Sequence, residues 1–256
     1  MIHATAIIHP GAELAEEVEI GPYAVIGAHV KIGKGTKVGP HAVVEGWTTI
    51  GEYNQIFQLA SVGAIPQDLK YKGEETYLKI GDRNIIREFA TINLGTVTGD
   101  GETTIGNDNL FMAYAHVAHD CTVGSNAVFA NCAALGGHVE IGDWVILGGL
   151  TAVHQFTKVG AHAFLAGGAI VTRDVPPYVM VAGNPAVPHA VNTEGLKRRG
   201  FDAAQIRGIR EAYRVLYRSE LRLSEALERL EALGAGRPEV RLFVEFLRRS
   251  ERSIVR

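Results

Sequence analysis

The sequence predicts a mainly β protein, built as a parallel β-helix of hexapeptide repeats with an α-helical domain at its C-terminal end. Three observations support this: aliphatic residues recur every six positions, glycine often follows them, and helical periodicity begins only where that repeat has stopped. A strict six-residue period is the signature of a hexapeptide solenoid. We therefore expect the β-helix over residues 1–189 and the helical domain over residues 190–256.

The repeat starts at the amino terminus. Eleven aliphatic residues stand six apart from Ile2 to Val62, and the spacing returns at Ile80 and again from Ile105 to Val171. Each hexad should supply one short strand and a bend, and three hexads should close a triangular coil, so that stacked coils bury the periodic residues in one column. The glycine that follows an aliphatic residue suits a corner where a side chain would be strained.

Two segments interrupt the repeat, because neither has aliphatic residues at the expected positions. They are residues 63–79 and residues 98–104, and both should loop out of the solenoid. Long loops on a rigid scaffold often carry function. The first contains Gln67, Asp68 and Lys70, whose side chains suit a polar ligand, whereas a tolerated surface insertion is the alternative interpretation.

The C-terminal region has the signals of a small helical domain. Proline and glycine are dense between the end of the repeat and residue 190, which is typical of a linker. Asp202 and Gln205 form a capping-box pair at the start of one helix, Ser224 is placed to cap a second, and Pro238 is placed to open a third. Apolar residues then recur at helical spacing, so these helices should pack on the end of the solenoid.

Composition favours a soluble protein of the cytoplasm. No apolar run approaches the roughly 20 residues that cross a bilayer, and the amino terminus lacks the basic-then-apolar pattern of a secretory signal. Cys121 and Cys132 lack the spacing of a zinc ribbon or a disulfide framework. We therefore expect free thiols, a cytoplasmic location and no stable membrane insertion.

Charge is distributed unevenly along the chain. Residues 1–189 hold 10 basic and 18 acidic side chains, a net charge of −8, whereas residues 190–256 hold 15 and 10, a net charge of +5. A basic end on an acidic body indicates an anionic partner, such as a phosphate, an acidic protein or a nucleic acid. A helical tail with a solvated arginine face is the other explanation.

Four histidines occupy outward positions of the hexad frame, namely His116, His119, His138 and His154. Cys121, by contrast, falls on an inward position and should pack in the core. Coils of about 18 residues would place the last three histidines along one outer strip. Such a strip suits either a histidine general base with polar helpers, or a metal site shared between subunits, as in zinc-dependent hydratases of the gamma-class carbonic anhydrase type. Asp120 beside His119 favours the general base.

Several motifs resemble the UDP-N-acetylglucosamine O-acyltransferase family of lipid A biosynthesis. They are H-V-A-H-D-C-T-V-G, L-G-G-H-V, A-V-H-Q-F, Q-D-L-K-Y-K-G and N-T-E-G-L-K-R-R-G-F, and the last is the most specific. The resemblance covers the whole chain, including both loops and the tail. It implies a left-handed β-helix, a homotrimer with clefts between neighbouring solenoids, and no cofactor, metal or nucleic-acid partner.

The resemblance also implies a reaction, the transfer of a 3-hydroxyacyl group from the thioester of acyl carrier protein to the 3-hydroxyl of UDP-N-acetylglucosamine. His119 matches the general base, with Asp120 beside it, because a neutral imidazole can take the proton of a sugar hydroxyl as it attacks. The backbone N–H of Gly137 matches the donor that stabilises the thioester oxyanion. A 3-amino sugar nucleotide is the alternative acceptor.

The same resemblance implies a set of substrate-binding residues. They are Gln67, Asp68, Lys70, Asn93, His116, His138, His154, Gln155, Gly167, Asn192, Glu194, Arg198 and Arg199. Arginine suits the diphosphate end of the nucleotide, and Gly167 leaves room for a medium to long acyl chain. The chain departs from the family at Asn93 and Leu94, where members have histidine and arginine, and at Pro185, where some have histidine.

Overall fold

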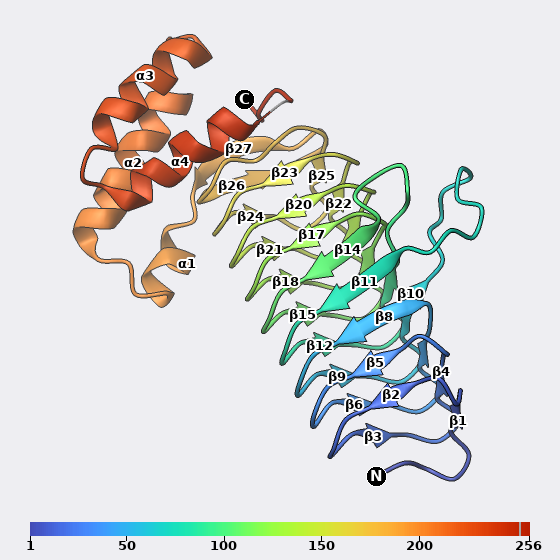
Figure 1. The fold of residues 1–256 in the computed structure, drawn as a ribbon. Helices are drawn as coiled ribbons and strands as arrows, with labels where there is room; N and C mark the ends of the chain where they lie inside the picture. The colour runs from blue at the N-terminus through green and yellow to red at the C-terminus, as the bar shows by residue number, and fades with distance from the viewer. Residues whose placement is uncertain (251) are drawn as a thin grey trace.

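The computed structural model describes residues 1–250 and 252–256, and it confirms a mainly β architecture with helices at the C-terminal end (Figure 1). The strands form the three faces of a long prism, and the helices sit at the end remote from the amino terminus. Neighbouring strands in each face come from successive coils and are parallel, except for β26 and β27, which pair antiparallel. None of the described helices is long and apolar enough to cross a membrane.

In the described part of the chain, the three faces are three sheets. The nine-stranded sheet contains β1 (Ile7–Ile8), β4 (Val25–Ile26), β7 (Val43–Val44), β10 (Ser61–Ala64), β13 (Thr91–Asn93), β16 (His116–Val117), β19 (Ala134–Leu135), β22 (Ala152–Val153) and β25 (Ile170–Val171). The eight-stranded sheet contains β2 (Glu13–Leu14), β5 (Lys31–Ile32), β8 (Trp47–Ile50), β11 (Tyr77–Ile80), β14 (Glu102–Ile105), β17 (Thr122–Val123), β20 (Glu140–Ile141) and β23 (Lys158–Val159). The ten-stranded sheet contains β3 (Glu19–Ile20), β6 (Lys37–Val38), β9 (Gln55–Ile56), β12 (Ile85–Ile86), β15 (Leu110–Phe111), β18 (Val128–Phe129), β21 (Ile146–Leu147), β24 (Phe164–Leu165), β26 (Val179–Ala182) and β27 (Val187–Val191).

The predicted column of periodic residues fills the prism. Ile26, Val62 and Leu135 are buried, and small residues such as Ala42 line the inner side of the corners between them. Burial of this column is what stabilises strands of two residues, which are too short to fold alone. The exception is the first coil, where Ile2 is 53% exposed because no coil stacks beneath it.

The sheets meet at three corners. The first corner joins the nine- and eight-stranded sheets, the second joins the eight- and ten-stranded sheets, and the third joins the ten- and nine-stranded sheets. The left-handed conformation falls on the third residue after the periodic one, as at Tyr53, Asp120 and Trp144. The glycine that follows the periodic residue has another role, since a Cβ on Gly33 would lie 2.6 Å from the Gly51 carbonyl of the next coil. A side chain would therefore be strained at Gly33, as predicted, but the cause is the close stacking of coils rather than a left-handed backbone.

Both predicted loops leave the solenoid at the first corner, with shifted ends. β11 begins at Tyr77, so the first loop covers residues 65–76 rather than 63–79. β14 begins at Glu102, so the second loop covers residues 94–101 rather than 98–104. The first loop is shorter than predicted because backbone pairing between coils continues where the aliphatic period has already stopped. The second loop starts earlier than predicted because β13 ends at Asn93.

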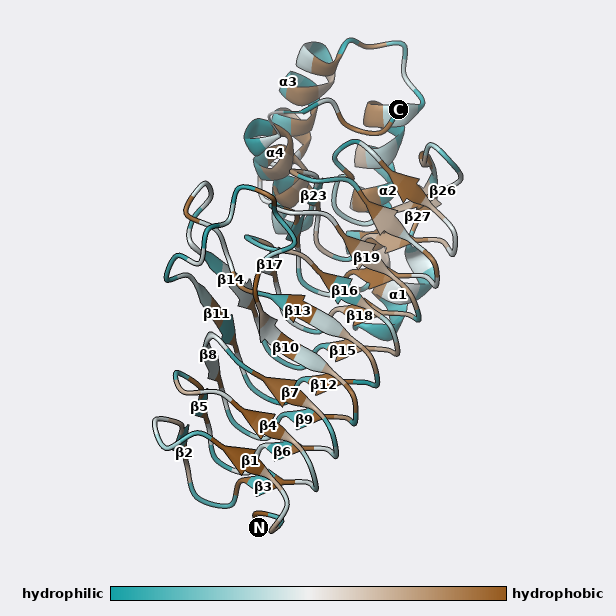
Figure 2. Ribbon diagram, turned by 90° about the vertical axis from the view of Figure 1, so that its right-hand side faces the viewer, coloured by the Kyte–Doolittle hydropathy of each residue, from teal (hydrophilic) through white to brown (hydrophobic). Residues whose placement is uncertain are grey.

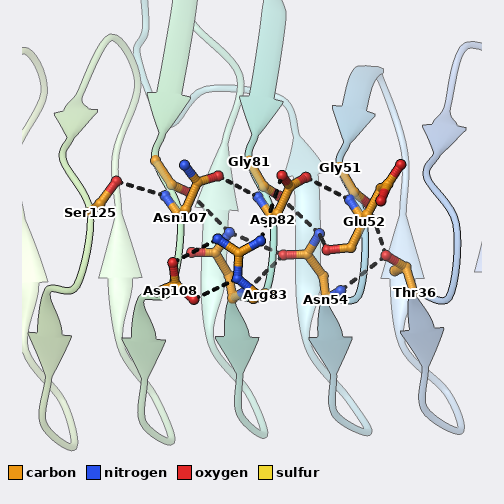
Figure 3. Close-up of polar contacts among 12 residues, drawn as sticks. Thr36, Gly51, Glu52, Asn54, Gly81, Asp82, Arg83, Asn107, Asp108 and Ser125 are labelled. Atoms are coloured by element: carbon orange, nitrogen blue, oxygen red, sulfur yellow. Dashed lines mark hydrogen bonds and ion pairs between the residues drawn. The ribbon is translucent and has the colours of Figure 1, made fainter.

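A buried polar ladder in the second corner lies outside what the hexad pattern predicts. Asn84 Nδ2 donates to Asn54 Oδ1 at 3.0 Å, and Asn109 Nδ2 donates to Asn84 Oδ1 at 2.9 Å. In an outer row, the Asp82 N–H donates to Asn107 Oδ1 at 2.7 Å (Figure 3). The three stacked asparagines are 30 and 25 residues apart rather than the regular 18, because the two loops are inserted between them. The ladder therefore holds the coils in register across both insertions while it satisfies buried amides.

The C-terminal helices of the described chain are α1 (Thr193–Arg198), α2 (Ala203–Tyr217), α3 (Leu223–Leu233) and α4 (Pro238–Arg249). The capping box of Asp202 and Gln205 is confirmed, and so is Pro238 in the first turn of its helix. The prediction that Ser224 caps a helix is wrong. The N-cap of that helix is Arg222, two residues earlier, and the Glu225 carboxylate accepts a hydrogen bond from the Arg222 N–H at 2.8 Å.

The short helix α1 is missing from the elements that the sequence predicts, because it has only six residues and includes a glycine. Asn192 caps it by accepting a hydrogen bond from the Gly195 N–H at 3.2 Å. β27 ends at Val191 and α1 begins at Thr193, so strand gives way to helix between these residues. The division of the chain into two domains at residue 190 stays a prediction.

Candidate active site

The first corner brings two of the predicted site histidines together from successive coils. His119 follows β16 and His138 follows β19, and their rings meet edge to face with centroids 5.1 Å apart. Phe156, rather than His154, stacks on His138, with centroids 4.3 Å apart. The expected strip of three histidines is therefore wrong in its third member, because coils of 18 residues place position 156 next to position 138.

Asp120 is a buried carboxylate that orients His119. Its side chain is fully buried, and its Oδ2 lies 2.8 Å from His119 Nδ1. Thr96, in the second loop, donates to the same carboxylate through its backbone N–H at 2.9 Å and through its hydroxyl at 2.6 Å. Because an ionised carboxylate only accepts hydrogen bonds, Nδ1 of His119 carries the proton and Nε2 keeps a free lone pair.

Gly137 lies directly against the imidazole of His119. A Cβ at this position would be 2.5 Å from Cε1 and 2.6 Å from Nε2 of His119, so only glycine fits under the ring. Among the described residues, the Gly137 N–H finds no hydrogen-bond acceptor. The same turn position in the neighbouring coils, at His119 and Gln155, also leaves its N–H without a protein acceptor, but only Gly137 of the three is buried. Buried N–H groups are rarely left unpaired, and this one lies next to a candidate base.

Two further histidines, His116 in β16 and His138 at the corner, are neutral near pH 7. Burial lowers the pKa of His116, whose Nδ1 lies 2.7 Å from the hydroxyl of Thr91. Burial also lowers the pKa of His138, although the carboxylates of Asp120 and, more weakly, Asp68 act in the opposite direction. Neutral imidazoles both donate and accept hydrogen bonds, which suits contacts with sugar hydroxyls.

The first loop places its predicted residues differently. Gln67 and Lys70 are exposed, whereas Asp68 is half-buried and accepts a hydrogen bond from the Lys70 N–H at 2.9 Å. Asn93 is buried beneath the loop, where its Nδ2 donates to the carbonyls of Ala64 at 3.3 Å and Ile65 at 3.2 Å. Asn93 therefore anchors the start of the loop, and its Oδ1 has no hydrogen-bond partner among the described residues.

The same corner holds three side chains that could in principle bind a metal ion. His119, Asp120 and His138 offer ligand atoms that all lie within 4.8 Å of one another. The carboxylate, however, already accepts hydrogen bonds from Thr96 and His119, and His138 Nε2 stands 3.8 Å from it. The arrangement fits an oriented general base better than a zinc centre.

The sequence matches known families along its length. The bacterial transferase hexapeptide model matches residues 1–34 and 102–137, and the model for UDP-N-acetylglucosamine O-acyltransferase, domain 2, matches residues 174–255. The acyl-[acyl-carrier-protein]–UDP-N-acetylglucosamine O-acyltransferase of Thiobacillus denitrificans is 56% identical over 255 residues, which span 100% of this chain and 99% of that protein. The chain belongs to the UDP-N-acetylglucosamine O-acyltransferase family.

Solved structures of the UDP-N-acetylglucosamine O-acyltransferase family have the same fold. The enzyme of Moraxella catarrhalis is 45% identical with a TM-score of 0.98, covering 100% of this chain and 99% of that one. The Francisella novicida enzyme is 44% identical with a TM-score of 0.98, covering 100% and 94%. The predicted left-handed β-helix and the predicted acyltransferase class are thereby confirmed.

The residues that the family resemblance places at the nucleotide end lie on a different corner. Asn192 is buried and donates to the His162 carbonyl at 2.9 Å, and Arg199 Nη1 lies 3.2 Å from His162 Nδ1. Glu194 pairs with Lys197, and Arg198, which follows it in α1, is exposed. Figure 2 shows α1 on the side of the solenoid opposite to β11 and β14, from which the two loops emerge. Within a single chain, therefore, these four nucleotide-end residues do not lie near His119.

His162 makes the second corner sensitive to acid. Burial and then the charge of Arg199 lower the pKa of His162 to about 4, from an ordinary value of 6.5. Between pH 6.5 and pH 4 the unfolded chain therefore binds a proton on His162 that the folded chain does not bind. The stability that comes from the neutral His162 is present above pH 6.5 and is lost as the pH falls toward 4. After a reduction for partial exposure, we expect His162→Gln to lessen the loss of unfolding free energy between pH 7 and pH 5 by about 1 kcal/mol.

The measurement for this prediction is urea unfolding of the wild type and of His162→Gln at both pH values. The same substitution at the exposed His189 is the matched control, which should leave the pH dependence unchanged. An equal loss of stability in the wild type and in His162→Gln would contradict the assignment.

The remaining predicted residues of this O-acyltransferase are exposed. Gly167 lies at the third corner, while His154 and Gln155 lie at the first. Arg252, from the C-terminal tail, donates to the Gln155 carbonyl at 3.1 Å and stands 5.7 Å from the centroid of the Phe156 ring. The residues Arg252, Phe156 and Thr96 lie at this site although they are not among those that the sequence predicts. For Thr96 a signal existed, since the second loop interrupts the hexads one coil before His119.

Proposed function

We propose that this protein transfers a 3-hydroxyacyl group from the thioester of acyl carrier protein to the 3-hydroxyl of UDP-N-acetylglucosamine, the first step of lipid A biosynthesis. The observation that carries the proposal is the juxtaposition of a carboxylate-oriented imidazole and a buried, unpaired N–H at Gly137. Full-length similarity to enzymes named for this acceptor and this donor agrees with it.

The chemistry follows from these groups. Nε2 of His119 takes the proton of the sugar 3-hydroxyl as its oxygen attacks the thioester carbonyl. The carbonyl oxygen becomes an oxyanion, which accepts a hydrogen bond from the Gly137 N–H. Collapse of the tetrahedral intermediate forms the ester and breaks the carbon–sulfur bond, and the His119 imidazolium returns its proton to the departing thiolate. The buried Asp120 carboxylate stabilises that imidazolium through Nδ1.

We assign the sugar to the first corner and the nucleotide to the second. Asp68, Gln67 and Lys70 approach from the first loop, and the half-buried imidazoles of His116 and His138 form the wall behind them. His154 and Gln155 extend this wall. At the other end, the basic side chains Arg198 and Arg199 suit a diphosphate, with Asn192 and Glu194 beside them in the sequence.

Because these two groups of residues lie on different corners, a single substrate contacts both only where two chains meet. We therefore propose a homotrimer in which the first corner of one chain faces the second corner of its neighbour. The third corner then lies on the threefold axis. The surface of the third corner supports this arrangement, since it carries a ridge of exposed apolar side chains: Tyr23, Leu59, Phe89, Tyr114 and Leu150.

The faces beside this ridge are apolar in part, although the lower coils of the ten-stranded sheet expose Glu19, Lys37 and Gln55, with an ion pair between Glu19 and Lys37 at 2.9 Å. Along the ten-stranded sheet, outward residues of successive coils pair as Ile85, Leu110, Val128, Ile146, Phe164 and Met180. The lower strands β1, β4 and β7 of the nine-stranded sheet are hydrophobic in Figure 2. The eight-stranded sheet instead carries ion pairs such as Glu140 with Lys158 at 3.0 Å. Apolar patches of this extent mark interfaces, whereas a charged ladder marks a solvated face.

We place the acyl chain on the nine-stranded sheet, between the first corner and the third. The outward residues at this height, Ala134 and Ala152, are small, and Gly149 and Gly167 follow at the third corner. The basic C-terminal region gives acyl carrier protein, an acidic partner, a surface of opposite charge. Free thiols agree with a cytoplasmic location.

The direct test is a transfer assay with UDP-N-acetylglucosamine and a panel of 3-hydroxyacyl carrier proteins of different chain length, with the ester product identified by mass spectrometry. The parallel acceptor, a UDP-sugar with a 3-amine, distinguishes the amide-forming alternative. Elemental analysis and carbon dioxide hydration assays of the same preparation test the alternative function, that of a zinc-dependent hydratase. Absence of the ester with every donor would overturn the proposal.

The trimer has its own test. Leu150 is 68% exposed in the single chain, and Leu150→Glu places a carboxylate there on the apolar ridge. Burying that charge at an interface is unfavourable. We expect sedimentation velocity to show a trimer for the wild type and a monomer or dimer for Leu150→Glu at micromolar concentration. Thr122→Glu, on the charged eight-stranded face, is the control and should remain trimeric.

A further inference from the structure

The second loop packs directly over the carboxylate of Asp120. Thr96 is 2% exposed, and it meets both carboxylate oxygens, with its N–H on Oδ1 and its hydroxyl on Oδ2. His119 Nδ1 is the third donor, also on Oδ2. The loop therefore supplies two of the three side-chain and backbone donors that hold this carboxylate.

The loop forms a tight turn that lies close to the carboxylate. The Gly99 and Gly101 N–H groups both donate to the Thr96 carbonyl, at 3.1 Å and 3.0 Å, which closes a tight turn. A Cβ on Gly99 would lie 2.6 Å from both the Asp120 carboxylate and Cε1 of His138. The backbone of the loop is thus in contact with two residues of the site.

The direction of the hydrogen bonds follows from the carboxylate. Because Asp120 only accepts, the Thr96 hydroxyl must donate to it, so the Thr98 hydroxyl, 3.0 Å away, donates to Thr96. A chain of donors runs from Thr98 through Thr96 to Asp120, and His119 donates to the same carboxylate from the other side. Such a network fixes the plane of the carboxylate and spreads its charge.

We propose that Thr96 is a positioning residue of the transferase, acting on His119 through Asp120, and that the second loop is inserted into the solenoid to deliver it. This inference rests on the proposed function, in which His119 is the base. The Thr96 hydroxyl keeps Oδ2 of Asp120 aligned with Nδ1 of His119, so that Nε2 of His119 points toward the Gly137 N–H. It also withdraws charge from the carboxylate, and this limits how strongly Asp120 stabilises the imidazolium.

The test is Thr96→Val, which keeps the size of the side chain and the backbone N–H but removes the hydroxyl. We expect kcat to fall about 10-fold, the cost of one hydrogen bond to a charged group, with little change in KM for UDP-N-acetylglucosamine. The acid limb of the kcat/KM profile should move to higher pH, because a carboxylate with one donor fewer stabilises the imidazolium more strongly. Thr96→Ser retains the hydroxyl and should restore both quantities.

The matched control is Thr104→Val, in the strand that follows the loop, where among the described residues the hydroxyl meets only that of Thr122, at 3.4 Å. It should leave kcat and the pH profile unchanged. A second readout needs no turnover: in protein with ¹⁵N-labelled histidine, the Hδ1 resonance of His119 should be sharp in the wild type and broadened by faster exchange in Thr96→Val.

The outcomes separate the two proposals. If Thr96→Val has the kcat and pH profile of the wild type, or if Thr96→Ser is as defective as Thr96→Val, the role of Thr96 is overturned. The proposed function still stands in either case, provided that the wild type catalyses transfer. If the wild type catalyses no transfer, the proposed function fails, whereas the Hδ1 resonance still reports whether Thr96 positions the carboxylate. Should Thr96→Val not fold, Thr96→Ala, which also removes the hydroxyl, takes its place in the same kinetic and resonance measurements.

Discussion

Replacement of His119 by alanine is expected to lower kcat by about 10³-fold, within the range of general-base catalysis, and to change KM for UDP-N-acetylglucosamine by less than about 3-fold. The imidazole is the only group of the pair placed to accept the hydroxyl proton, since Asp120 is fully buried behind it. Loss of the base slows the step in which the sugar oxygen attacks, while the binding contacts of the loops and corners remain. Steady-state kinetics with a purified hydroxyacyl carrier protein checks this.

The control for His119→Ala is His9→Ala, at an exposed imidazole in the first coil. Thermal unfolding should be similar for both variants and the wild type, because neither ring belongs to the buried column. Turnover by His119→Ala within about 10-fold of the wild type would be too fast for loss of a general base and would reject this assignment.

Gly137→Ala should lower kcat by about 10²-fold, because displacing a catalytic group by about 1 Å has an effect of that size. The added methyl group would lie 2.6 Å from Nε2 and 2.5 Å from Cε1 of His119, so the ring must leave the position in which it meets Asp120. The backbone of Gly137 is not in the left-handed region, so alanine adds no strain of its own. The measurement is kcat together with the thermal unfolding midpoint, which should change little.

Gly149→Ala is a closely matched control. Gly149 occupies the same hexad position as Gly137, two residues after the periodic leucine, but at the third corner. A Cβ there meets its nearest atom, the Asn131 carbonyl oxygen, at 3.4 Å, which is tolerable. With a short-chain donor, Gly149→Ala should retain activity. Equal activity of the two variants would show that the collision with His119 is unimportant.

Much of the fold could be predicted because one physical constraint repeats. Every sixth residue from Ile2 onward must be apolar to fill the prism, so inward and outward positions could be assigned along the whole solenoid. That assignment placed Cys121 in the core, where burial raises its pKa to about 12, and placed the site histidines outside it. Helix starts at Asp202 and Pro238 were equally readable, since capping depends on local residues alone.

The errors made within the solenoid share a cause, which is that they concern contacts between coils, whereas the Ser224 error concerns only the local start of a helix. The hexad spacing says which residues point outward, but a shift of two residues decides whether His154 or Phe156 stacks on His138. The loop ends were misplaced because backbone pairing needs no aliphatic residue. The asparagine ladder was missed because its members are 25 and 30 residues apart, spacings that the loops themselves create.

The sequence by itself determined the solenoid, the loops at its interruptions, the helical tail and the pair of His119 with Asp120, because these depend on short-range periodicity and on motifs. Only the tertiary structure decided that both loops leave the first corner, that Thr96 reaches Asp120 from 24 residues away, and that Arg199 belongs to the second corner. The physical reason is that a side chain meets its partners where separate coils stack, and stacking distance is set by chain closure and insertions rather than by spacing along the sequence.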